Sequence, residues 1–278
     1  MKIIENASLK DYSNYRLGGI AKRLIIIEDV DELLILDKDI LLNAEIIGNG
    51  TNILVSDKDI DKDVIKIATS GYWIDGERII ARAGVNLTEM AIDLVKKGYQ
   101  DFLFAVGIPG TVGGAVIMNA GTDKMISDVV ENVEVMTRDK VKKDLPVSEL
   151  QYSYRNSILQ GMDCIVMSVI FKAEKGEPVS QEQIDRKLND RARNHPLSFP
   201  SAGCWFKGAY GGNDIIKEIG MAGKWQGGAV SSPLFPAFIL NVNATAQSIY
   251  SLAKEIQDKA KAIGKSLPFE IKLIGGFE

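Results

Sequence analysis

Residues 107–121 read Gly-Ile-Pro-Gly-Thr-Val-Gly-Gly-Ala-Val-Ile-Met-Asn-Ala-Gly, and this stretch decides how the chain is interpreted. Glycine has no Cβ, so backbone N–H groups in such a stretch can approach a pyrophosphate closely. The stretch is not a G-x-G-x-x-G motif opening a βαβ unit, and it is not a Walker P-loop, which requires Gly-Lys-Ser/Thr. It therefore predicts a ligand loop rather than a series of tight turns, with the pyrophosphate held by loops instead of a Rossmann helix.

A second glycine-rich stretch, Gly48-Asn49-Gly50-Thr51-Asn52, lies between two apolar runs at residues 45–48 and 52–55. Both runs have the length and composition of short strands. Taken alone, this stretch is better explained as a tight turn. Taken with residues 107–121, it predicts the second of two ligand loops that follow different strands.

Periodic apolar positions predict the elements around these loops. Residues 86–97 and 245–263 repeat apolar side chains on one helical face, and Ser180 with Gln183 predicts a capping box for a helix over residues 181–194. Strands are expected at residues 22–27, 45–48, 52–55, 64–67, 129–136, 164–172 and 270–274, with a hairpin turning at Asp75-Gly76. Strands and helices do not alternate strictly, so the predicted fold class is α+β rather than a doubly wound sheet.

Length and composition are those of an ordinary globular protein. The chain has 278 residues, of which 46% are hydrophobic and 25% charged, and this length favours about two domains. The best linker is at residues 174–178. A net charge of -4 gives no global positive field, so no nucleic-acid partner is expected. No apolar run approaches the ~20 residues of a membrane span, so we expect a cytoplasmic protein without a membrane partner.

Few residues are available for metal or disulfide chemistry. The two cysteines, Cys164 and Cys204, make neither a disulfide framework nor a zinc site. The single histidine, His195, excludes a multi-histidine metal site and most histidine-based mechanisms. No metal is expected.

Three further segments carry reactive side chains. Arg155, in the segment 152–157, suits a carboxylate or phosphate, although an arginine beside aromatic residues often only lies along them. Cys204, in the segment 201–207, could donate a proton or act as a nucleophile, and the alternative is a buried, inert thiol. Glu270 lies in an apolar stretch that would favour its protonated form, and it could equally be a solvated strand residue.

Together these segments resemble one family, the UDP-N-acetylenolpyruvoylglucosamine reductases, in its compact variant. The resemblance covers nearly the whole chain, and residues 107–121 are its most specific part. The segments that carry it are Gly-Asn-Gly-Thr-Asn-Ile-Leu-Val-Ser-Asp (48–57), residues 107–121, Ser-Tyr-Arg-Asn-Ser (153–157), Pro-Ser-Ala-Gly-Cys-Trp-Phe-Lys (200–207) and Pro-Phe-Glu-Ile-Lys (268–272), with Asn-Tyr-Arg-Leu-Gly-Gly (14–19) at the start.

The resemblance implies a fold and a cofactor. Residues 1–176 would form an FAD-binding region of the vanillyl-alcohol-oxidase type, with subdomains at about 1–69 and 70–176. Residues 177–278 would form a smaller α+β substrate domain whose C-terminal strand returns towards the FAD region. The residues expected to contact FAD are Gly48, Asn49, Gly50, Thr51, Asn52, Gly84, Gly107, Ile108, Pro109, Gly110, Thr111, Gly113, Gly114, Asn119, Ala120 and Gly121.

The resemblance also implies a reaction in peptidoglycan synthesis. In the family, NADPH reduces FAD, and flavin N5 then gives hydride to C3 of the enolpyruvyl ether of UDP-N-acetylglucosamine. Arg155 and Glu270 would stabilise the resulting enolate, which requires Glu270 to be protonated or hydrogen-bonded. Cys204 would protonate C2, and Tyr154 and Lys207 would line the substrate site. We expect a monomer whose only partner is this UDP-sugar.

The chain departs from the family pattern on the substrate side. Cys204 replaces the usual serine proton donor, and a thiol is a stronger acid than an alcohol. The other departures are Asn194 for a lysine, Gly208-Ala209 for Asn-Pro, Phe235 for a histidine and Lys272 for an arginine. Two alternatives therefore remain: a related flavin oxidoreductase with a different substrate, and a non-catalytic flavin-binding paralogue. Retention of Arg155, of Glu270 and of a proton-bearing group at Cys204 argues against the non-catalytic paralogue.

Overall fold

The computed structural model describes residues 1–208 and 211–278, which form two compact units. The first unit comprises Met1–Ile4, Leu24–Gly48 and Lys62–Arg191, and the second comprises Glu5–Arg23, Asn49–Asp61 and Ala192–Glu278. The chain therefore crosses between the units several times, once within the stretch 48–52. The expected boundary between functional domains near residue 176 is a different kind of division and stays a prediction.

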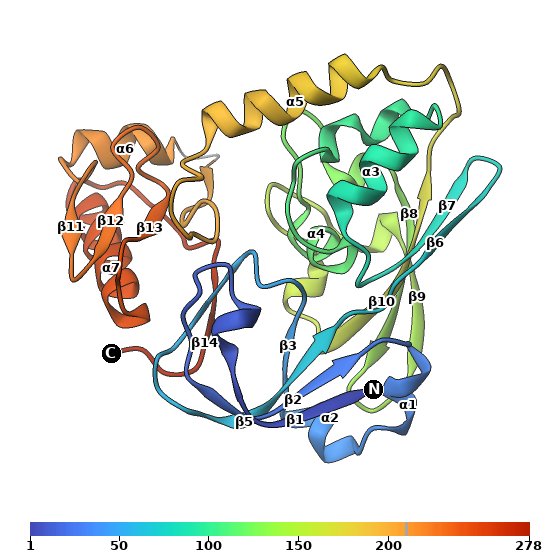
Figure 1. Ribbon diagram of the computed structural model, residues 1–278, viewed down its shortest axis with the longest axis horizontal. Coiled ribbons are helices and arrows are strands. Elements are labelled where there is room, and N and C mark those ends of the chain that lie inside the picture. The colour runs from blue at the N-terminus through green and yellow to red at the C-terminus, as the bar shows by residue number, and fades with distance from the viewer. Residues whose placement is uncertain (209–210) are drawn as a thin grey trace. The chain divides into compact units, whose positions relative to one another are not determined.

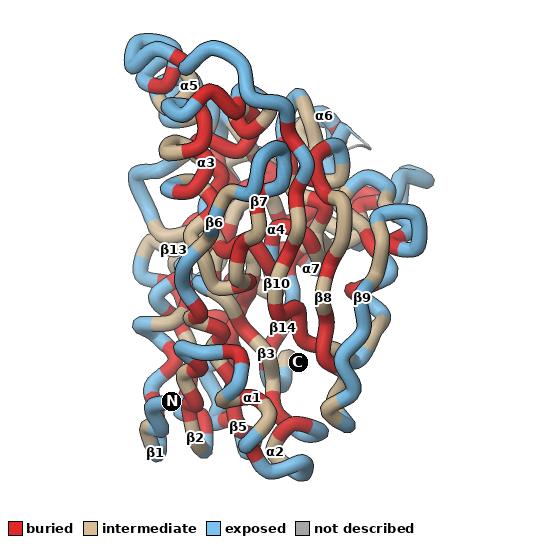
Figure 2. The backbone as a smooth tube through the Cα atoms, turned by 90° about the vertical axis from the view of Figure 1, so that its right-hand side faces the viewer, coloured by how far each residue is buried: buried red, intermediate tan, exposed pale blue. Residues whose placement is uncertain are grey.

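The first unit is built on a five-stranded antiparallel sheet in the order β6-β7-β10-β8-β9 (Figure 1). The strands are β6 (Tyr72–Asp75), β7 (Arg78–Arg82), β8 (Val130–Thr137), β9 (Lys142–Pro146) and β10 (Cys164–Lys172). The predicted hairpin at Asp75-Gly76 joins β6 and β7, and Gly76 takes the positive φ of 60° that the turn needs. Buried backbone follows β8 and β10 in Figure 2, whereas the edge strand β9 is largely exposed.

Helix α3 (Leu87–Lys96) confirms the helix predicted over residues 86–97. Asn86 caps it by accepting a hydrogen bond from the Glu89 N–H, and the predicted apolar face is buried. Gly98 ends it with a φ of 100°. Helix α5 (Gln181–Asn194) has the predicted bounds, Ser180 and Gln183 hydrogen-bond reciprocally at its start, and Figure 1 shows it in gold above α3.

Helix α4 (Val112–Met118) corrects the prediction that residues 107–121 form a loop throughout. Glycine has low helix propensity, so the sequence around Gly113 and Gly114 does not predict a helix. Tertiary packing overrides that preference, because a Cβ on Gly113 would lie 3.0 Å from the Ala83 Cβ. Glycine at this position therefore lets α4 pack closely against the chain that follows β7.

A four-stranded sheet in the order β1-β2-β5-β3 completes the N-terminal part. Its strands are β1 (Lys2–Ser8), β2 (Ile20–Ile27), β5 (Ile60–Ile67) and β3 (Glu45–Ile47), and β3 pairs parallel to β5. Strand β1 was not predicted, because Glu5 and Asn6 interrupt its apolar pattern and most of it is exposed. Two short helices, α1 (Asp31–Ile35) and α2 (Lys38–Asn43), lie between β2 and β3 in the chain.

The second unit packs helix α7 (Ala246–Ala262) against the antiparallel strands β11 (Trp225–Gln226), β12 (Ala229–Ser231) and β13 (Ile239–Asn241), shown in orange and red in Figure 1. Thr245 caps α7, which confirms the helix predicted there, and α6 (Gly212–Glu218) packs beside it. Strand β14 (Lys272–Ile274) pairs in parallel with β4 (Ile53–Val55). In the described parts of the chain, no helix has the length and apolar character needed to cross a membrane.

Short 3₁₀ helices connect these elements. They are η1 (Leu9–Tyr12), η2 (Gln100–Ala105), η3 (Ile126–Asp128), η4 (Val147–Glu149) and η5 (Ile158–Gln160). The fold is α+β, as the mixture of short strands and helices predicted.

Candidate active site

The two glycine-rich stretches meet at Gly48 and Thr111 in the first unit. A Cβ placed on Gly48 would lie 2.7 Å from the Thr111 Oγ1, so only glycine permits this approach. Thr111 Oγ1 caps α4 by accepting from the Gly114 N–H at 3.3 Å, and Lys66 Nζ donates to the Gly48 carbonyl at 3.0 Å. Burial lowers the pKa of Lys66. Two stretches distant in sequence thus form one loop pair.

The backbone conformation of the segment before α4 is fixed by a side-chain hydrogen bond and by two glycines with positive φ. Thr88 Oγ1 donates to the Ile108 carbonyl at 2.7 Å, and Gly107 and Gly110 have φ values of 85° and 117°. The backbone at Gly114 is exposed, and a Cβ there would contact only the Thr111 Oγ1, at 3.4 Å. A side chain at Gly114 would cover this exposed backbone, whereas glycine leaves it accessible, which fits close approach of a pyrophosphate.

At three other glycines predicted to contact the cofactor, close packing within the protein already requires glycine. A Cβ on Gly50 would collide with the Tyr12 carbonyl, one on Gly84 with the Thr69 backbone, and one on Gly121 with the Lys124 carbonyl. Close packing of backbone on backbone therefore accounts for these glycines without a ligand. Their contact with FAD stays a prediction.

Arg155 is tied to the end of the 107–121 stretch. Its guanidinium donates to the carbonyl oxygens of Asn119 at 3.2 Å and Gly121 at 2.8 Å. It also lies 5.1 Å from the centre of the Tyr154 ring. This is the contact expected of an arginine that lies along an aromatic neighbour, the alternative to an anion-binding role. Asn119 Nδ2 donates to the Ser153 carbonyl at 2.9 Å, so the two segments are joined from both sides. Arg155 has a φ of 51°, a conformation uncommon outside glycine.

In the second unit, the Cys204 segment and the C-terminal segment lie side by side. The Glu270 N–H donates to the Trp205 carbonyl at 2.8 Å, and the Lys207 N–H donates to the Pro268 carbonyl at 3.0 Å. Asn52 Nδ2 donates to the Glu270 carbonyl at 3.0 Å. The end of the first glycine-rich stretch therefore joins the two segments that carry Cys204 and Glu270.

Cys204 borders a cavity of about 380 Å³. The cavity is also lined by Gly208, Gly211, Gly212, Asn213, Asp214, Lys217, Leu234, Phe235 and Ala237. Two of the departures from the family pattern, Gly208 and Phe235, thus lie in the same cavity as the thiol. Of the others, Asn194 is exposed at the end of α5, Lys272 begins β14, and Ala209 lies outside the described residues.

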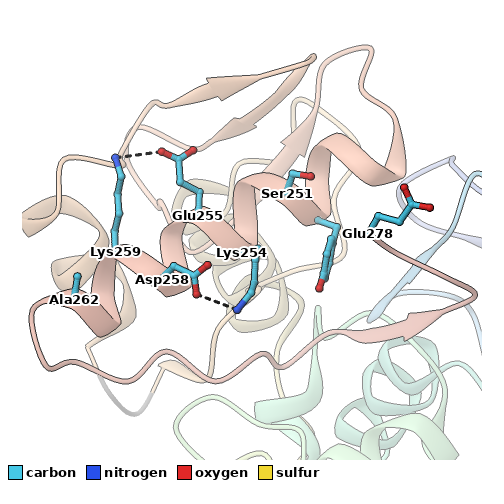
Figure 3. A pocket seen from close by; sticks show the side chains of 8 residues that line it. Ser251, Lys254, Glu255, Asp258, Lys259, Ala262 and Glu278 are labelled. Carbon is cyan, nitrogen blue, oxygen red and sulfur yellow. Dashed lines mark hydrogen bonds and ion pairs between the residues drawn. The ribbon is translucent and has the colours of Figure 1, made fainter.

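A larger hollow of about 560 Å³ lies along the exposed face of α7 (Figure 3). Its charged side chains pair within the helix, with Lys254 bonded to Asp258 at 2.9 Å and Lys259 to Glu255 at 3.2 Å. None of the predicted site residues lines it. This hollow is a solvated helix face rather than a site for the predicted chemistry.

The predicted residues therefore fall into two groups. Gly48, residues 107–121 and the segment around Arg155 come together in the first unit, and Cys204, Lys207 and Glu270 come together in the second. Sequence reasoning missed Lys66 and the cavity residues Asn213 and Lys217, because no motif marks them and only the fold brings them to the site. In the described part of the chain, no cluster of His, Cys, Asp and Glu could hold a metal ion.

Comparison with known proteins finds two matching families and relatives that span nearly the whole chain. Residues 38–140 match a family described as "FAD binding domain", and residues 195–274 match "UDP-N-acetylenolpyruvoylglucosamine reductase, C-terminal domain". A UDP-N-acetylenolpyruvoylglucosamine reductase of Caldanaerobacter subterraneus is 37% identical over 99% of this chain and 94% of its own length. One of Clostridium botulinum (strain Eklund 17B) is 36% identical over 98% of this chain and 92% of its own.

A solved structure of the corresponding reductase from Thermus caldophilus superimposes with a TM-score of 0.81 and 31% identity, covering 99% of this chain and 98% of that one. The similarity extends over both family regions and the segments between them. The chain therefore belongs to the UDP-N-acetylenolpyruvoylglucosamine reductase family, and it is an FAD-dependent oxidoreductase.

Proposed function

We propose that the chain uses NADPH to reduce UDP-N-acetylglucosamine enolpyruvate to UDP-N-acetylmuramate for peptidoglycan synthesis. The observation that carries this proposal is the joining of the Cys204 and Glu270 segments through the Trp205 carbonyl, beside a cavity that Cys204 lines. A proton donor and a carboxyl group on adjacent segments are what protonation of an enolate needs. We expect the protein to act as a cytoplasmic monomer.

FAD would be held by the loop pair around Gly48 and Thr111, with the exposed backbone at Gly114 facing its pyrophosphate. When bound, FAD would supply the hydride for the two-electron reduction of the enolpyruvyl group at C3, with NADPH as the source of the electrons. Lys66 fixes the Gly48 carbonyl and places a positive charge near this loop. Arg155 fixes the opposite end of the stretch through Asn119 and Gly121.

Negative charge develops at the substrate carboxylate in the reaction, and we assign Arg155 and Glu270 the role of stabilising it. A cationic guanidinium stabilises an enolate directly, and a protonated Glu270 donates a hydrogen bond to it. Tyr154, which is 39% exposed beside Arg155, and the half-buried Lys207 would bind the rest of the substrate. Cys204 then gives its proton to C2, and the thiolate regains a proton from solvent.

One observation favours a second candidate, a related flavin oxidoreductase with another substrate. Gly208 and Phe235 share the cavity with Cys204, so two departures from the family pattern lie beside the reacting group. An aromatic ring in place of an imidazole removes a hydrogen-bonding group, and such a change alters which substrate is accepted.

An anaerobic absorbance experiment tests the proposal. Purified protein reconstituted with FAD should be bleached by NADPH, and UDP-N-acetylglucosamine enolpyruvate should then restore the colour and yield UDP-N-acetylmuramate. Bleaching without recovery would favour the second candidate. Bound flavin that NADPH does not bleach would identify a non-catalytic flavin-binding protein. Failure to take up FAD would contradict every one of these functions.

A further inference from the structure

Tyr15 is buried completely in the second unit, far in sequence from the Cys204 segment that it contacts. Its hydroxyl accepts a hydrogen bond from Trp205 Nε1 at 2.5 Å and donates to the Ile239 carbonyl at 2.8 Å. The Tyr15 hydroxyl is therefore bonded to the side chain of the residue that directly follows Cys204.

The backbone around Tyr15 is fixed as firmly as its hydroxyl. Asn241 Nδ2 donates to the Tyr15 carbonyl at 2.8 Å, and the Asn241 N–H donates to the Pro200 carbonyl at 2.9 Å. Asn14 Nδ2 donates to the Ser201 carbonyl at 3.2 Å. The start of the turn that carries Cys204 is thus bonded to the 14–15 segment and to the end of β13.

The turn before Cys204 contains one position, Gly203, that packing does not fix. Gly203 has a φ of 84°, and no atom lies within 4 Å of the position that its Cβ would take. Packing therefore does not fix Gly203, although it precedes the thiol directly. The Trp205 ring is fully buried and the Trp205 backbone N–H donates to the Ala237 carbonyl at 2.7 Å, so Trp205 is the fixed end of the turn.

We propose that Tyr15 is a positioning residue that holds the Cys204 thiol at the reacting carbon, by fixing the neighbouring Trp205 side chain through its hydroxyl. The proposal rests on the proposed function, in which Cys204 is the proton donor. A buried hydroxyl in a fixed network keeps one orientation, and proton transfer depends steeply on the position of the donor. Burial also raises the pKa of Tyr15, so the hydroxyl stays protonated and keeps donating to Ile239 across the neutral range.

The test compares Tyr15→Phe with a matched control, Tyr99→Phe. Tyr99 is buried in the first unit, and its hydroxyl donates to the Gly76 carbonyl at 2.9 Å, so both changes remove one buried hydroxyl. Holoenzyme is reduced with NADPH, mixed anaerobically with UDP-N-acetylglucosamine enolpyruvate, and product is measured in a single turnover. We expect Tyr15→Phe to slow product formation on the order of ten- to a hundredfold, with flavin bleaching by NADPH unchanged. Tyr99→Phe should affect neither step.

A double variant separates positioning from general destabilisation. If Tyr15 acts through the thiol, Tyr15→Phe should have no further effect on product formation once Cys204→Ala is present. Additive losses in the double variant would overturn the proposal, and so would an unaltered rate in Tyr15→Phe. If Tyr15→Phe does not fold, Trp205→Phe removes the other partner of the same bond and carries the same expectations. Wild-type protein that bleaches but forms no product would instead contradict the proposed function, and the positioning proposal with it.

Discussion

Asn52 and Glu270, 218 positions apart in the chain, are joined by a hydrogen bond from the Asn52 side chain to the Glu270 carbonyl at 3.0 Å. The bond fixes the backbone that carries the carboxyl group of Glu270. A second bond lies two residues later, where the Lys272 N–H donates to the Asn52 carbonyl at 3.1 Å. The first glycine-rich stretch thus supports the C-terminal segment directly.

We expect Asn52→Ala to lower the free energy of unfolding by about 1 kcal/mol, the net contribution of a typical hydrogen bond. It should also slow the substrate half-reaction, because the backbone of Glu270 loses a fixed partner. Denaturant unfolding and single-turnover product formation measure the two effects. The control is Asn43→Ala, whose amide donates to the Asp39 carbonyl at 2.9 Å on an exposed helix. Equal, small effects in both variants would show that the bond to Glu270 is incidental.

Gly203→Ala tests the conformation of the turn before Cys204. Because space is open around Gly203, the cost comes from its positive φ and should be about 1–2 kcal/mol in unfolding free energy. Product formation should fall further than stability explains, since the strain is adjacent to the thiol. Gly71→Ala is the matched control, because Gly71 also has a positive φ, 94°, with no neighbour within 4 Å. A catalytic defect of the same size in both variants would refute the local explanation.

Gly48→Ala should reduce the FAD content of purified protein, because the new methyl group would lie 2.7 Å from the Thr111 Oγ1 and push the two loops apart. Thr111→Ala alone should cost about 1 kcal/mol through loss of the α4 cap. Combined, the two changes should be less damaging than their sum, since the colliding atom is gone. The measurement is flavin absorbance per protein at saturating FAD. If the losses of FAD content in the two single variants add up in the double variant, the new methyl group does not collide with Thr111.

Cys204→Ala should slow product formation by about 10²–10⁴-fold, the usual contribution of a general acid. Flavin bleaching by NADPH should not change, because the thiol acts only after hydride transfer. Cys204→Ser should recover most of the lost rate, since an alcohol also carries a transferable proton. If both half-reactions are unaltered in Cys204→Ala, Cys204 is structural.

Cys164 should react slowly with iodoacetamide in the folded protein. Burial raises the pKa of its thiol, so less thiolate is present at any pH below that pKa. In the Cys204→Ala background, where it is the remaining cysteine, its alkylation rate should rise at a higher pH than in the same chain unfolded in denaturant. Coincident pH profiles for the folded and unfolded chains would show that burial does not control this thiol.

The helices and central strands could be predicted because their signals are local. Apolar spacing and capping residues mark α3, α5 and α7, and the structure confirms all three. Helix α4 could not be predicted, since two glycines oppose it and only its packing against Ala83 favours it. The edge strand β9 was missed for a related reason, because three of its five residues are charged and its first three are exposed.

The site was predictable as a set of segments, and their contacts were not. The sequence marks Gly48 and Thr111 as members of glycine-rich stretches, yet nothing local indicates that they touch. The same holds for Tyr15 and Trp205, whose bond depends on a fold that brings residues 190 positions apart together. The partners of Arg155 could not be predicted either, because its guanidinium donates to backbone carbonyls, which no sequence motif marks.

The parallel pairing of β14 with β4 has a consequence for synthesis of the chain on the ribosome. Residues 53–55 leave the exit tunnel long before their partner strand at residues 272–274. The second unit therefore cannot complete its fold until residues 272–274 have emerged, and β4 lacks its partner strand until then. A fragment of residues 195–278 would lack β4 and Tyr15, which belong to the same unit. Residues 195–278 therefore cannot be exchanged between proteins as an independent module.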